Sequence, residues 1–339
     1  MTRIKIILIG CLFALGIAGS LELCLRILTS VITVYDVEMI KYAKELKIAS
    51  PYPEISHIHR PNTSANLMGV DVSLNSLGHR NPNLPSSKDT DDIRILMIGS
   101  SITLGWGVEE DKTIISETAS RLNEELGRQT EKRFIGINAG VGNYNTVYSV
   151  ELFKRQLKDT DPDVVVFQYY INDAEPNPVG ANSILIKHSL LFALLSTRFQ
   201  QMLFTTSSTS LSEYYENLYS KNNEGWKNAQ AAFSELKQIS RDRGIRLVVL
   251  LVPEMHNLSA DSPYPPIYKL IEGLFDGMGV SFISSYPALS AAFAANPAMA
   301  WVAKDDPHPS AAAHKIISNI LYDFLVTNLH PLAWRLQTK

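Results

Sequence analysis

Cysteine is almost absent from this chain. Only Cys11 and Cys24 occur among its 339 residues, and both lie in an apolar N-terminal stretch. A disulfide framework and a zinc site built from cysteines are therefore excluded. An excess of basic charge is also missing, because the chain has 31 Lys and Arg residues, 34 Asp and Glu residues and a formal net charge of −3. Since no basic field is available to attract phosphates, we expect no nucleic-acid partner.

Cofactor and metal motifs are lacking as well. No two of the eight histidines have the spacing of metal ligands together with a carboxylate. The stretch 99–107 contains glycines but has neither the dinucleotide-binding nor the Walker spacing. The sequence therefore predicts a protein that uses no metal and no cofactor.

The composition is that of a folded protein. Hydrophobic residues make up 45% of the chain and charged residues 19%, which excludes a disordered chain. A chain of this length buries a sizeable core, either as one large α/β domain or as two smaller domains.

An apolar stretch near the N-terminus predicts a membrane segment. Residues 6–21 are sixteen uncharged positions preceded by Arg3 and Lys5. As a helix they rise about 24 Å, slightly less than a hydrocarbon core of roughly 30 Å. The apolar character continues beyond Glu22, so we favour an uncleaved signal anchor within residues 1–35. A signal peptide cleaved near residues 18–20 and a lipoprotein modified at Cys11 are the alternatives.

All three alternatives place the main domain outside the cytoplasm. Positive charge before an apolar span keeps the N-terminus on the cytoplasmic side. The sequence thus predicts a single-pass, membrane-anchored protein whose main domain lies on the periplasmic or extracellular face.

The rest of the chain divides into a lead-in and an α/β domain. Residues 36–90 mix charges with turn formers, which predicts a connector and an irregular lead-in. Residues 91–330 alternate between apolar strands and amphipathic helices, which predicts a mostly parallel sheet covered on both faces. The expected strands are 93–98, 134–138, 164–167, 246–252 and 280–284, and the expected helices are 114–126, 147–157, 226–241, 267–275 and 310–326.

Residues 180–223 interrupt this alternation. An apolar stripe predicts a helix near 184–204. We expect this helix to pack on the domain; a lid over a pocket and a surface that rests on the membrane are the alternatives.

Residues suited to acyl transfer follow successive strands. Open α/β sheets bind ligands beyond the carboxyl ends of their strands. Ser101 follows the first strand at a turn whose free N–H groups favour a developing oxyanion. The loop with Gly142 and Asn143 follows the second strand and can present a main-chain N–H, and Asn172 follows the third and can donate its side-chain amide. Each residue alone has a plainer role in a turn or cap, but their order along the chain favours a catalytic site.

A general base is expected before the last helix. His308 lies in a loop stiffened by prolines and is preceded by Asp305 and Asp306. A carboxylate at this spacing can orient an imidazole for proton transfer. Asp305 fits the spacing D-x-x-H and Asp306 the shorter D-x-H; we favour Asp305.

These residues resemble the SGNH (GDSL-like) hydrolase family over residues 91–327. The resemblance implies a three-layer α/β/α, flavodoxin-like fold. It also implies that Ser101 is the nucleophile and an oxyanion donor, that Asn172 is the oxyanion-hole asparagine and that His308 is the base. Ser100 replaces the Asp that precedes the nucleophile in the family, and Asn143 aligns with the glycine of the second block unless Gly142 takes that place.

An upstream element also resembles membrane-anchored bacterial members of the group. Residues 75–80 read N-S-L-G-H-R, which matches N-S-x-G-x-R before the first strand. A β-turn with Gly78 at a positive φ explains the same residues equally well.

The predicted function is an extracytoplasmic serine esterase that removes acyl groups, most simply acetyl, from a carbohydrate or lipid. The first alternative is an O-acetyltransferase of a cell-surface polysaccharide with the same triad. The second is a non-catalytic envelope or glycan-binding protein. Envelope polysaccharide machinery is the expected partner, by analogy with the membrane-anchored relatives.

Overall fold

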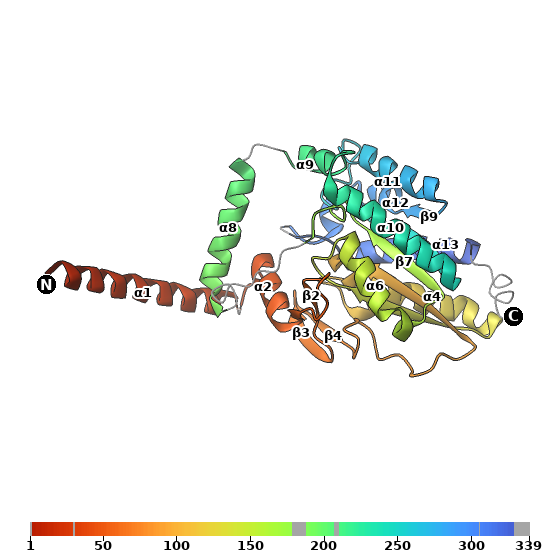
Figure 1. The fold of residues 1–339 in the computed structure, drawn as a ribbon, viewed down its shortest axis with the longest axis horizontal. Coiled ribbons are helices and arrows are strands. Elements are labelled where there is room, and N and C mark those ends of the chain that lie inside the picture. The colour runs from red at the N-terminus through yellow and green to blue at the C-terminus, as the bar shows by residue number, and fades with distance from the viewer. Residues whose placement is uncertain (1, 30, 178–187, 207–209, 305, 329–339) are drawn as a thin grey trace.

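A five-stranded parallel sheet forms the centre of the protein (Figure 1). The structure is a computed structural model, and it describes residues 2–29, 31–177, 188–206, 210–304 and 306–328. The strand order is β6-β5-β7-β8-β9, and every neighbouring pair is parallel. The strands are β5 (Asp92–Gly99), β6 (Arg133–Gly140), β7 (Val164–Tyr169), β8 (Arg246–Leu251) and β9 (Ser281–Ser284).

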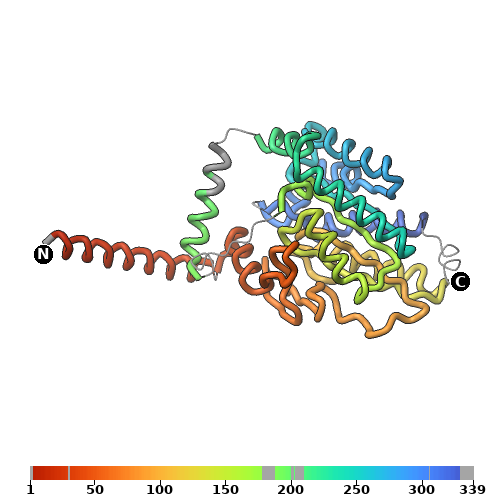
Figure 2. Tube along the Cα trace, viewed as in Figure 1, coloured from red at the N-terminus to blue at the C-terminus, as the bar shows by residue number. Residues whose placement is uncertain are grey.

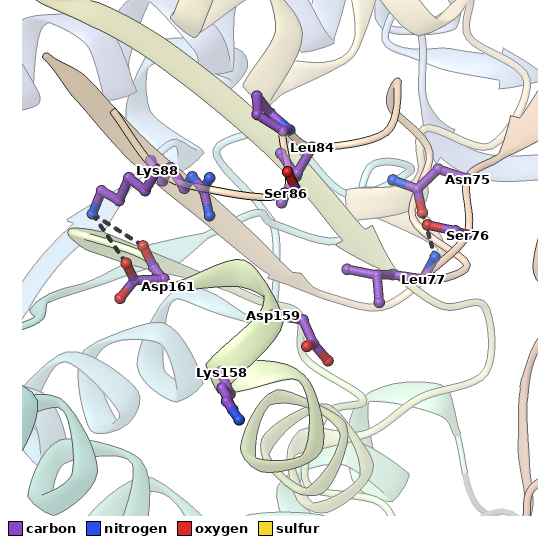
Figure 3. Close-up of a pocket in the computed structure, with 11 residues that line it drawn as sticks. Asn75, Ser76, Leu77, Leu84, Ser86, Lys88, Lys158, Asp159 and Asp161 are labelled. Carbon is purple, nitrogen blue, oxygen red and sulfur yellow. Dashed lines mark hydrogen bonds and ion pairs between the residues drawn. The ribbon is translucent and has the colours of Figure 1, made fainter. Parts of the chain in front are cut away.

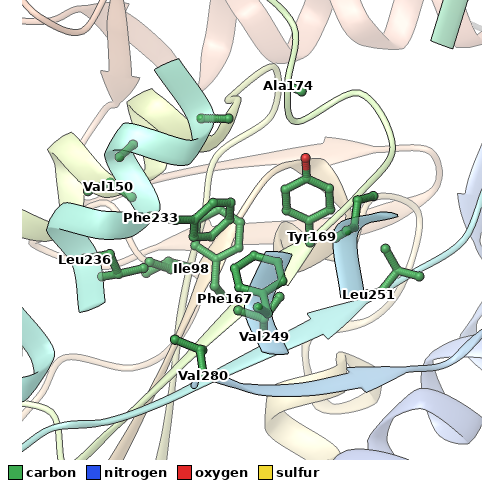
Figure 4. Packing of buried hydrophobic residues seen from close by; sticks show 14 of the residues in the cluster. Ile98, Val150, Phe167, Tyr169, Ala174, Phe233, Leu236, Val249, Leu251 and Val280 are labelled. Carbon is green, nitrogen blue, oxygen red and sulfur yellow. The ribbon is translucent and has the colours of Figure 1, made fainter. Parts of the chain in front are cut away.

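Helices cover both faces of this sheet. On one face, Ile95 and Met97 of β5 pack with apolar residues of α4 and α13. On the other, Leu96 and Ile98 pack with residues of α6, α10 and α11, as Figure 4 shows for Ile98. The principal helices are α4 (Ile114–Leu122), α6 (Thr146–Thr160), α10 (Glu224–Arg243), α11 (Pro265–Met278), α12 (Tyr286–Phe293) and α13 (Ala311–Asn328).

This architecture confirms the predicted three-layer α/β/α fold with a parallel sheet. All residues of β5 and β7 are buried, because helices cover both faces of a parallel sheet. The strand order is that of a flavodoxin-like sheet. One expected helix ends early: α4 stops at Leu122, and the chain continues as a π-helical stretch, η2 (Asn123–Gly127), and α5 (Arg128–Thr130).

The lead-in differs from the irregular connector predicted for it. It contains α2 (Tyr35–Glu45) and two hairpins, formed by β1 (Lys47–Ala49) with β2 (His57–His59) and by β3 (Thr63–Leu67) with β4 (Val70–Leu74). Tyr42 and Leu46 of α2 are fully buried and pack in one cluster with Leu104 and Trp106 of the main domain. Turn formers in the sequence therefore mark hairpin turns rather than a loose connection.

Two apolar helices lie outside the α/β core. Helix α1 (Thr2–Thr29) projects from the domain. Helix α8 (Leu190–Thr206) contacts the C-terminal end of α1 and runs across it (Figures 1 and 2). By length and composition α1 can cross a membrane, and none of its apolar window is buried; a signal anchor and a signal peptide both have this character. The helix expected near 184–204 begins at Leu190, and residues 184–187 lie outside the described residues.

The remaining elements are short. They are α3 (Ser101–Leu104), η1 (Glu110–Lys112), α9 (Leu211–Leu218), η3 (Pro297–Met299), β10 (Trp301–Ala303) and β11 (Asp306–Pro309). Strands β10 and β11 pair with each other in antiparallel fashion, so the segment around His308, expected as a loop, is a strand.

The close approach of β6 to α3 leads us to predict that a side chain at Gly140 lowers stability. A Cβ at Gly140 would lie 2.2 Å from Leu104 N and 2.6 Å from Thr103 C, both of which are backbone atoms. We expect Gly140→Ala to lower the free energy of unfolding by about 1–3 kcal/mol, since the backbone has to move. Gly273→Ala is the matched control, because it lies in α11 with nothing within 4 Å of a Cβ, and we expect about 0.5–1 kcal/mol of stabilisation. Urea unfolding followed by circular dichroism measures both, and a Gly140→Ala protein as stable as the wild type would contradict this packing.

Candidate active site

The turn after β5 presents Ser101. Strand β5 ends at Gly99, whose φ of +153° and close surroundings exclude a side chain, since a Cβ there would lie 2.5 Å from Thr103 Oγ1. The chain then enters α3, whose first residue is Ser101. Ser101 is half-buried at the carboxyl edge of the sheet. The abrupt strand-to-helix turn therefore projects its hydroxyl at the edge where open α/β sheets bind ligands.

Ser101, His308 and Asp306 form a hydrogen-bonded relay. Ser101 Oγ lies 2.7 Å from His308 Nε2, and His308 Nδ1 lies 2.5 Å from Asp306 Oδ1. The Asp306 side chain is fully buried, and its second oxygen accepts a hydrogen bond from Trp106 Nε1 at 2.8 Å. A carboxylate only accepts, so the Nδ1–H tautomer of His308 is favoured and Nε2 is left to accept the serine proton.

Asp306 is the carboxylate that bonds to His308, whereas the sequence favoured Asp305 for this role. Asp306 and His308 are two residues apart in β11, so their side chains point to the same side of the strand. Asp306 Oδ1 also accepts the main-chain N–H of His308 at 3.0 Å, which holds the carboxylate against the ring. Asp305 lies outside the described residues. The spacing D-x-x-H assumed a loop, whereas strand geometry favours D-x-H.

Three neighbouring loops, one of which carries Ser101, meet at the same edge of the sheet. Strand β5 lies between β6 and β7, so the Asn143 loop and the Asn172 turn flank the turn that carries Ser101. Val141 N donates to Gly99 O at 3.1 Å, and Thr146 N donates to Asp173 O at 3.0 Å. These bonds join the loop after β6 to both of its neighbours, and all three loops therefore lie at one edge.

The candidate oxyanion donors differ in their availability. The Gly142 N–H donates to Tyr42 Oη at 2.7 Å and is therefore engaged within the protein. Within the described chain, the main-chain N–H groups of Ser101 and Asn143 and the side-chain amide of Asn172 make no hydrogen bond. Asn143, at φ +65°, is thus better placed than Gly142 to present a free N–H from this loop.

A buried carboxyl group holds the turn that carries Asn172. Asp173 accepts a hydrogen bond from Tyr170 N at 2.7 Å. Burial raises the pKa of the Asp173 carboxyl group well above its usual value, because desolvation disfavours its charged form. The hydrogen bond from Tyr170 N fixes the shape of the turn beside Asn172.

The N-S-L-G-H-R element supports the loop after β6 through a buried relay. Gly78 O lies 2.8 Å from His59 Nδ1, and His59 Nε2 lies 2.7 Å from Tyr42 Oη, which accepts the Gly142 N–H. Because a carbonyl only accepts, His59 Nδ1 carries the proton and Nε2 accepts from the tyrosine hydroxyl. Gly78 has φ +78°, and a Cβ there would lie 2.9 Å from His59 Cβ. The sequence pattern alone did not reveal this supporting role.

Arg80 supports the turn that carries the nucleophile. Its side chain is fully buried, and Nη1 donates to Leu104 O at 3.0 Å and to Gly105 O at 2.7 Å, at the end of α3. Nη2 donates to Asp71 O at 3.1 Å. A buried guanidinium that satisfies carbonyls at this helix end fixes α3 relative to the lead-in.

Another pocket contains none of the candidate catalytic residues. It has a volume of about 420 Å³ and is lined by residues such as Ser76, Lys88, Lys158 and Asp161 (Figure 3). Lys88 Nζ donates to Asp161 O at 3.1 Å and pairs with Asp163 at 2.7 Å. Lys88 is thus engaged by neighbouring backbone and carboxylate groups, and we assign this pocket no role.

Within the described residues, no group of three or more His, Cys, Asp and Glu side chains is arranged to hold a metal ion. His314 lies on α13, is buried and accepts a hydrogen bond from Ile114 N at 3.2 Å, so it has a packing role.

Comparisons with known proteins show likeness at the level of the fold. No protein-family model and no curated protein sequence matches the chain. A two-domain esterase active on acetylated mannans matches with a TM-score of 0.44 and 14% identity, over 70% of this chain and 49% of that one. An acetyl xylan esterase matches with 0.39 and 17%, over 68% and 98%. A member of the lipolytic G-D-S-L family from Veillonella parvula matches with 0.42 and 11%, over 70% and 99%. These identities and TM-scores describe a distant likeness in fold.

The two aspartates provide a matched pair of variants. We expect Asp306→Asn to lower kcat about 10⁴-fold, because an amide at this position favours the wrong tautomer of His308. Asp305→Asn is expected to leave kcat near the wild-type value. Hydrolysis of 4-nitrophenyl acetate measures both, and an equal loss in Asp305→Asn would contradict the assignment of Asp306.

Three buried histidines predict a loss of stability in acid. Burial lowers the pKa of His59 to about 3, of His79 to about 4 and of His314 to about 3. In the unfolded chain these imidazoles have a pKa of about 6.5. Between that pH and about pH 4 the unfolded chain therefore binds more protons than the folded one. The free energy of unfolding is therefore at its full value above pH 6.5 and falls as the pH drops below it. Urea midpoints between pH 7.5 and 4.5 measure the effect, and a constant midpoint over this range would refute it.

Proposed function

We propose that this protein is a serine ester hydrolase that works through an acyl-enzyme on Ser101. The observation that carries the proposal is the continuous relay from Ser101 Oγ to His308 and Asp306, with contacts of 2.7 and 2.5 Å. A nucleophile, a base and a group that orients the base are the set that acyl transfer requires.

The proposed reaction has two steps. His308 Nε2 takes the Ser101 proton as the oxygen attacks the ester carbonyl, and the same proton then passes to the leaving alkoxide as the ester bond breaks. In the second step His308 removes a proton from water as the water oxygen attacks the acyl carbonyl. The bond between the acyl carbon and Ser101 Oγ then breaks, the carboxylic acid leaves, and His308 returns the proton to Ser101 Oγ. Asp306 keeps its negative charge throughout and stabilises the imidazolium that forms in each step.

The free donors at the sheet edge would hold the oxyanion. We assign this role to the main-chain N–H groups of Ser101 and Asn143 and to the side-chain amide of Asn172. Donors fixed before the reaction stabilise the developing charge without reorganisation. Gly142 contributes indirectly, since its bond to Tyr42 Oη holds the loop.

The substrate class follows from the predicted location. Arg3 and Lys5 precede the apolar helix, and this pattern supports our proposal that the α/β domain lies outside the cytoplasm on a signal anchor. A site tethered there meets acyl esters of cell-surface carbohydrates and lipids, and we propose an acetylated carbohydrate or a lipid ester as substrate, with envelope polysaccharide machinery as the associated partner.

The adjacent serines test the nucleophile. We expect Ser101→Ala to lower kcat for 4-nitrophenyl acetate at least ~10³-fold, because the members of a triad act as a unit. Ser100→Ala is the matched control and is expected to retain activity, since Ser100 Oγ makes no cap hydrogen bond. Covalent labelling of Ser101 by a fluorophosphonate, read by mass spectrometry, provides a second measurement. A Ser101→Ala enzyme with undiminished turnover would overturn the proposal.

The same assay separates hydrolysis from transfer. With an oligosaccharide present, a hydrolase releases acetate, whereas an O-acetyltransferase forms an acetylated sugar. A protein that binds glycans but has no Ser101-dependent turnover would instead be the non-catalytic alternative.

A further inference from the structure

Helix α8 exposes a stripe of large apolar side chains. Phe192, Leu195 and Phe199 are 40%, 60% and 57% exposed. Their spacing of three and four residues places them on one face of the helix. Beyond residue 32, few large apolar side chains in the described chain are exposed to this extent, and most of them lie on α8. Such a contiguous patch marks an interaction surface.

The other side of α8 attaches to the protein. Ala193 is buried, and Arg198 pairs with Asp36 of α2 at 2.8 Å. The helix therefore has one face committed to the chain and another that is uncovered. Phe192, Leu195 and Phe199 are therefore exposed even though α8 is attached to the rest of the protein.

Helix α8 starts at a carboxylate of α1. Glu22 Oε1 accepts a hydrogen bond from Leu190 N at 3.0 Å, and Oε2 accepts one from Leu191 N at 2.8 Å. A carboxylate at a helix N-terminus satisfies free N–H groups and the helix dipole. Arg26 binds the same carboxylate and donates to His188 O at 3.0 Å. The start of α8 is thus held at the level of Glu22.

Glu22 directly follows the uncharged stretch 6–21 of α1. The sixteen uncharged residues before it span about 24 Å, and Glu22 is the first charged residue after Lys5. When residues 6–21 of α1 occupy the hydrocarbon layer of a membrane, the charged Glu22 lies at the boundary of that layer, and α8 begins at the same depth. Figure 1 shows α8 running across the axis of α1 rather than along it.

We propose that α8 is an interfacial helix that lies along the outer surface of the lipid bilayer and inserts Phe192, Leu195 and Phe199 into it. A helix that begins at this boundary and runs across a membrane span lies in the plane of the interface. Aromatic and leucine side chains on one face are what such helices bury in lipid. The occupant of the stripe is therefore the bilayer that α1 crosses, and α8 is the second attachment of the protein to it.

Fluorescence quenching by labelled lipids tests this contact. The full-length chain with Cys11→Ser and Cys24→Ser carries one new cysteine, Leu195→Cys, labelled with an environment-sensitive fluorophore. The protein is reconstituted into vesicles of phosphatidylethanolamine and phosphatidylglycerol, with or without nitroxide-labelled lipid. We expect the label at position 195 to lose most of its fluorescence in the nitroxide vesicles. Phe199→Cys repeats the measurement in case the first variant folds poorly.

Two further positions calibrate the result. Native Cys11, labelled in a chain with Cys24→Ser, reports whether α1 is inserted. Leu270→Cys on α11 is the matched control, since Leu270 is likewise exposed, at 44%, but lies on the α/β domain. We expect a label at position 270 to retain its fluorescence. Quenching at position 11 without quenching at 195 and 199 would overturn the proposal. A blue-shifted but unquenched label at 195 would also overturn it, because protein, such as a second copy of the chain, would then cover the stripe. No outcome depends on turnover, so the result is independent of the proposed esterase activity.

Discussion

The contact between Ser101 Oγ and His308 Nε2 joins residues that are 207 positions apart, and the arrangement of the whole domain serves it. A parallel sheet brings the carboxyl ends of its strands to one edge, and β5 lies between the two strands whose loops carry Asn143 and Asn172. His308 reaches this edge on β11, a short strand outside the central sheet that β10 holds in place. If either the turn after Gly99 or the β10–β11 hairpin moved by the length of a hydrogen bond, the relay would open.

Buried polar groups maintain this geometry. Arg80 fixes the end of α3, and Tyr42 with His59 fixes the Gly142 amide. Every one of these side chains comes from the lead-in, yet every one acts on a loop of the main domain. Burial of a polar group costs free energy unless the group has a hydrogen-bond partner. The network therefore favours the backbone arrangement in which these hydrogen bonds form over other arrangements of the same loops. The lead-in is therefore a structural part of the site.

Helix α2 also relates the site to the apolar helix α8. Tyr35 at its start has its ring centroid 6.1 Å from that of His308, and the next residue, Asp36, pairs with Arg198 of α8. The same helix turn thus contacts the candidate catalytic base and the helix proposed to lie on the bilayer. In the proposed arrangement of α8, the site would therefore lie close to the membrane surface.

The sequence by itself determined the elements whose signals are local. Apolar runs such as 164–167 can be satisfied only by burial on both faces, and the alternation of these runs with amphipathic helices specifies a parallel sheet. Ser101, Asn172 and His308 could be singled out because each follows or precedes an element that was itself predictable. Only the tertiary structure decided between Asp305 and Asp306 as the partner of His308, since the choice depends on β11 being a strand. It alone showed that Gly142 is engaged by Tyr42 and that Arg80 and His59 support the site. These relations link segments far apart in the chain, and spacing along a sequence carries no information on which buried donors and acceptors will meet.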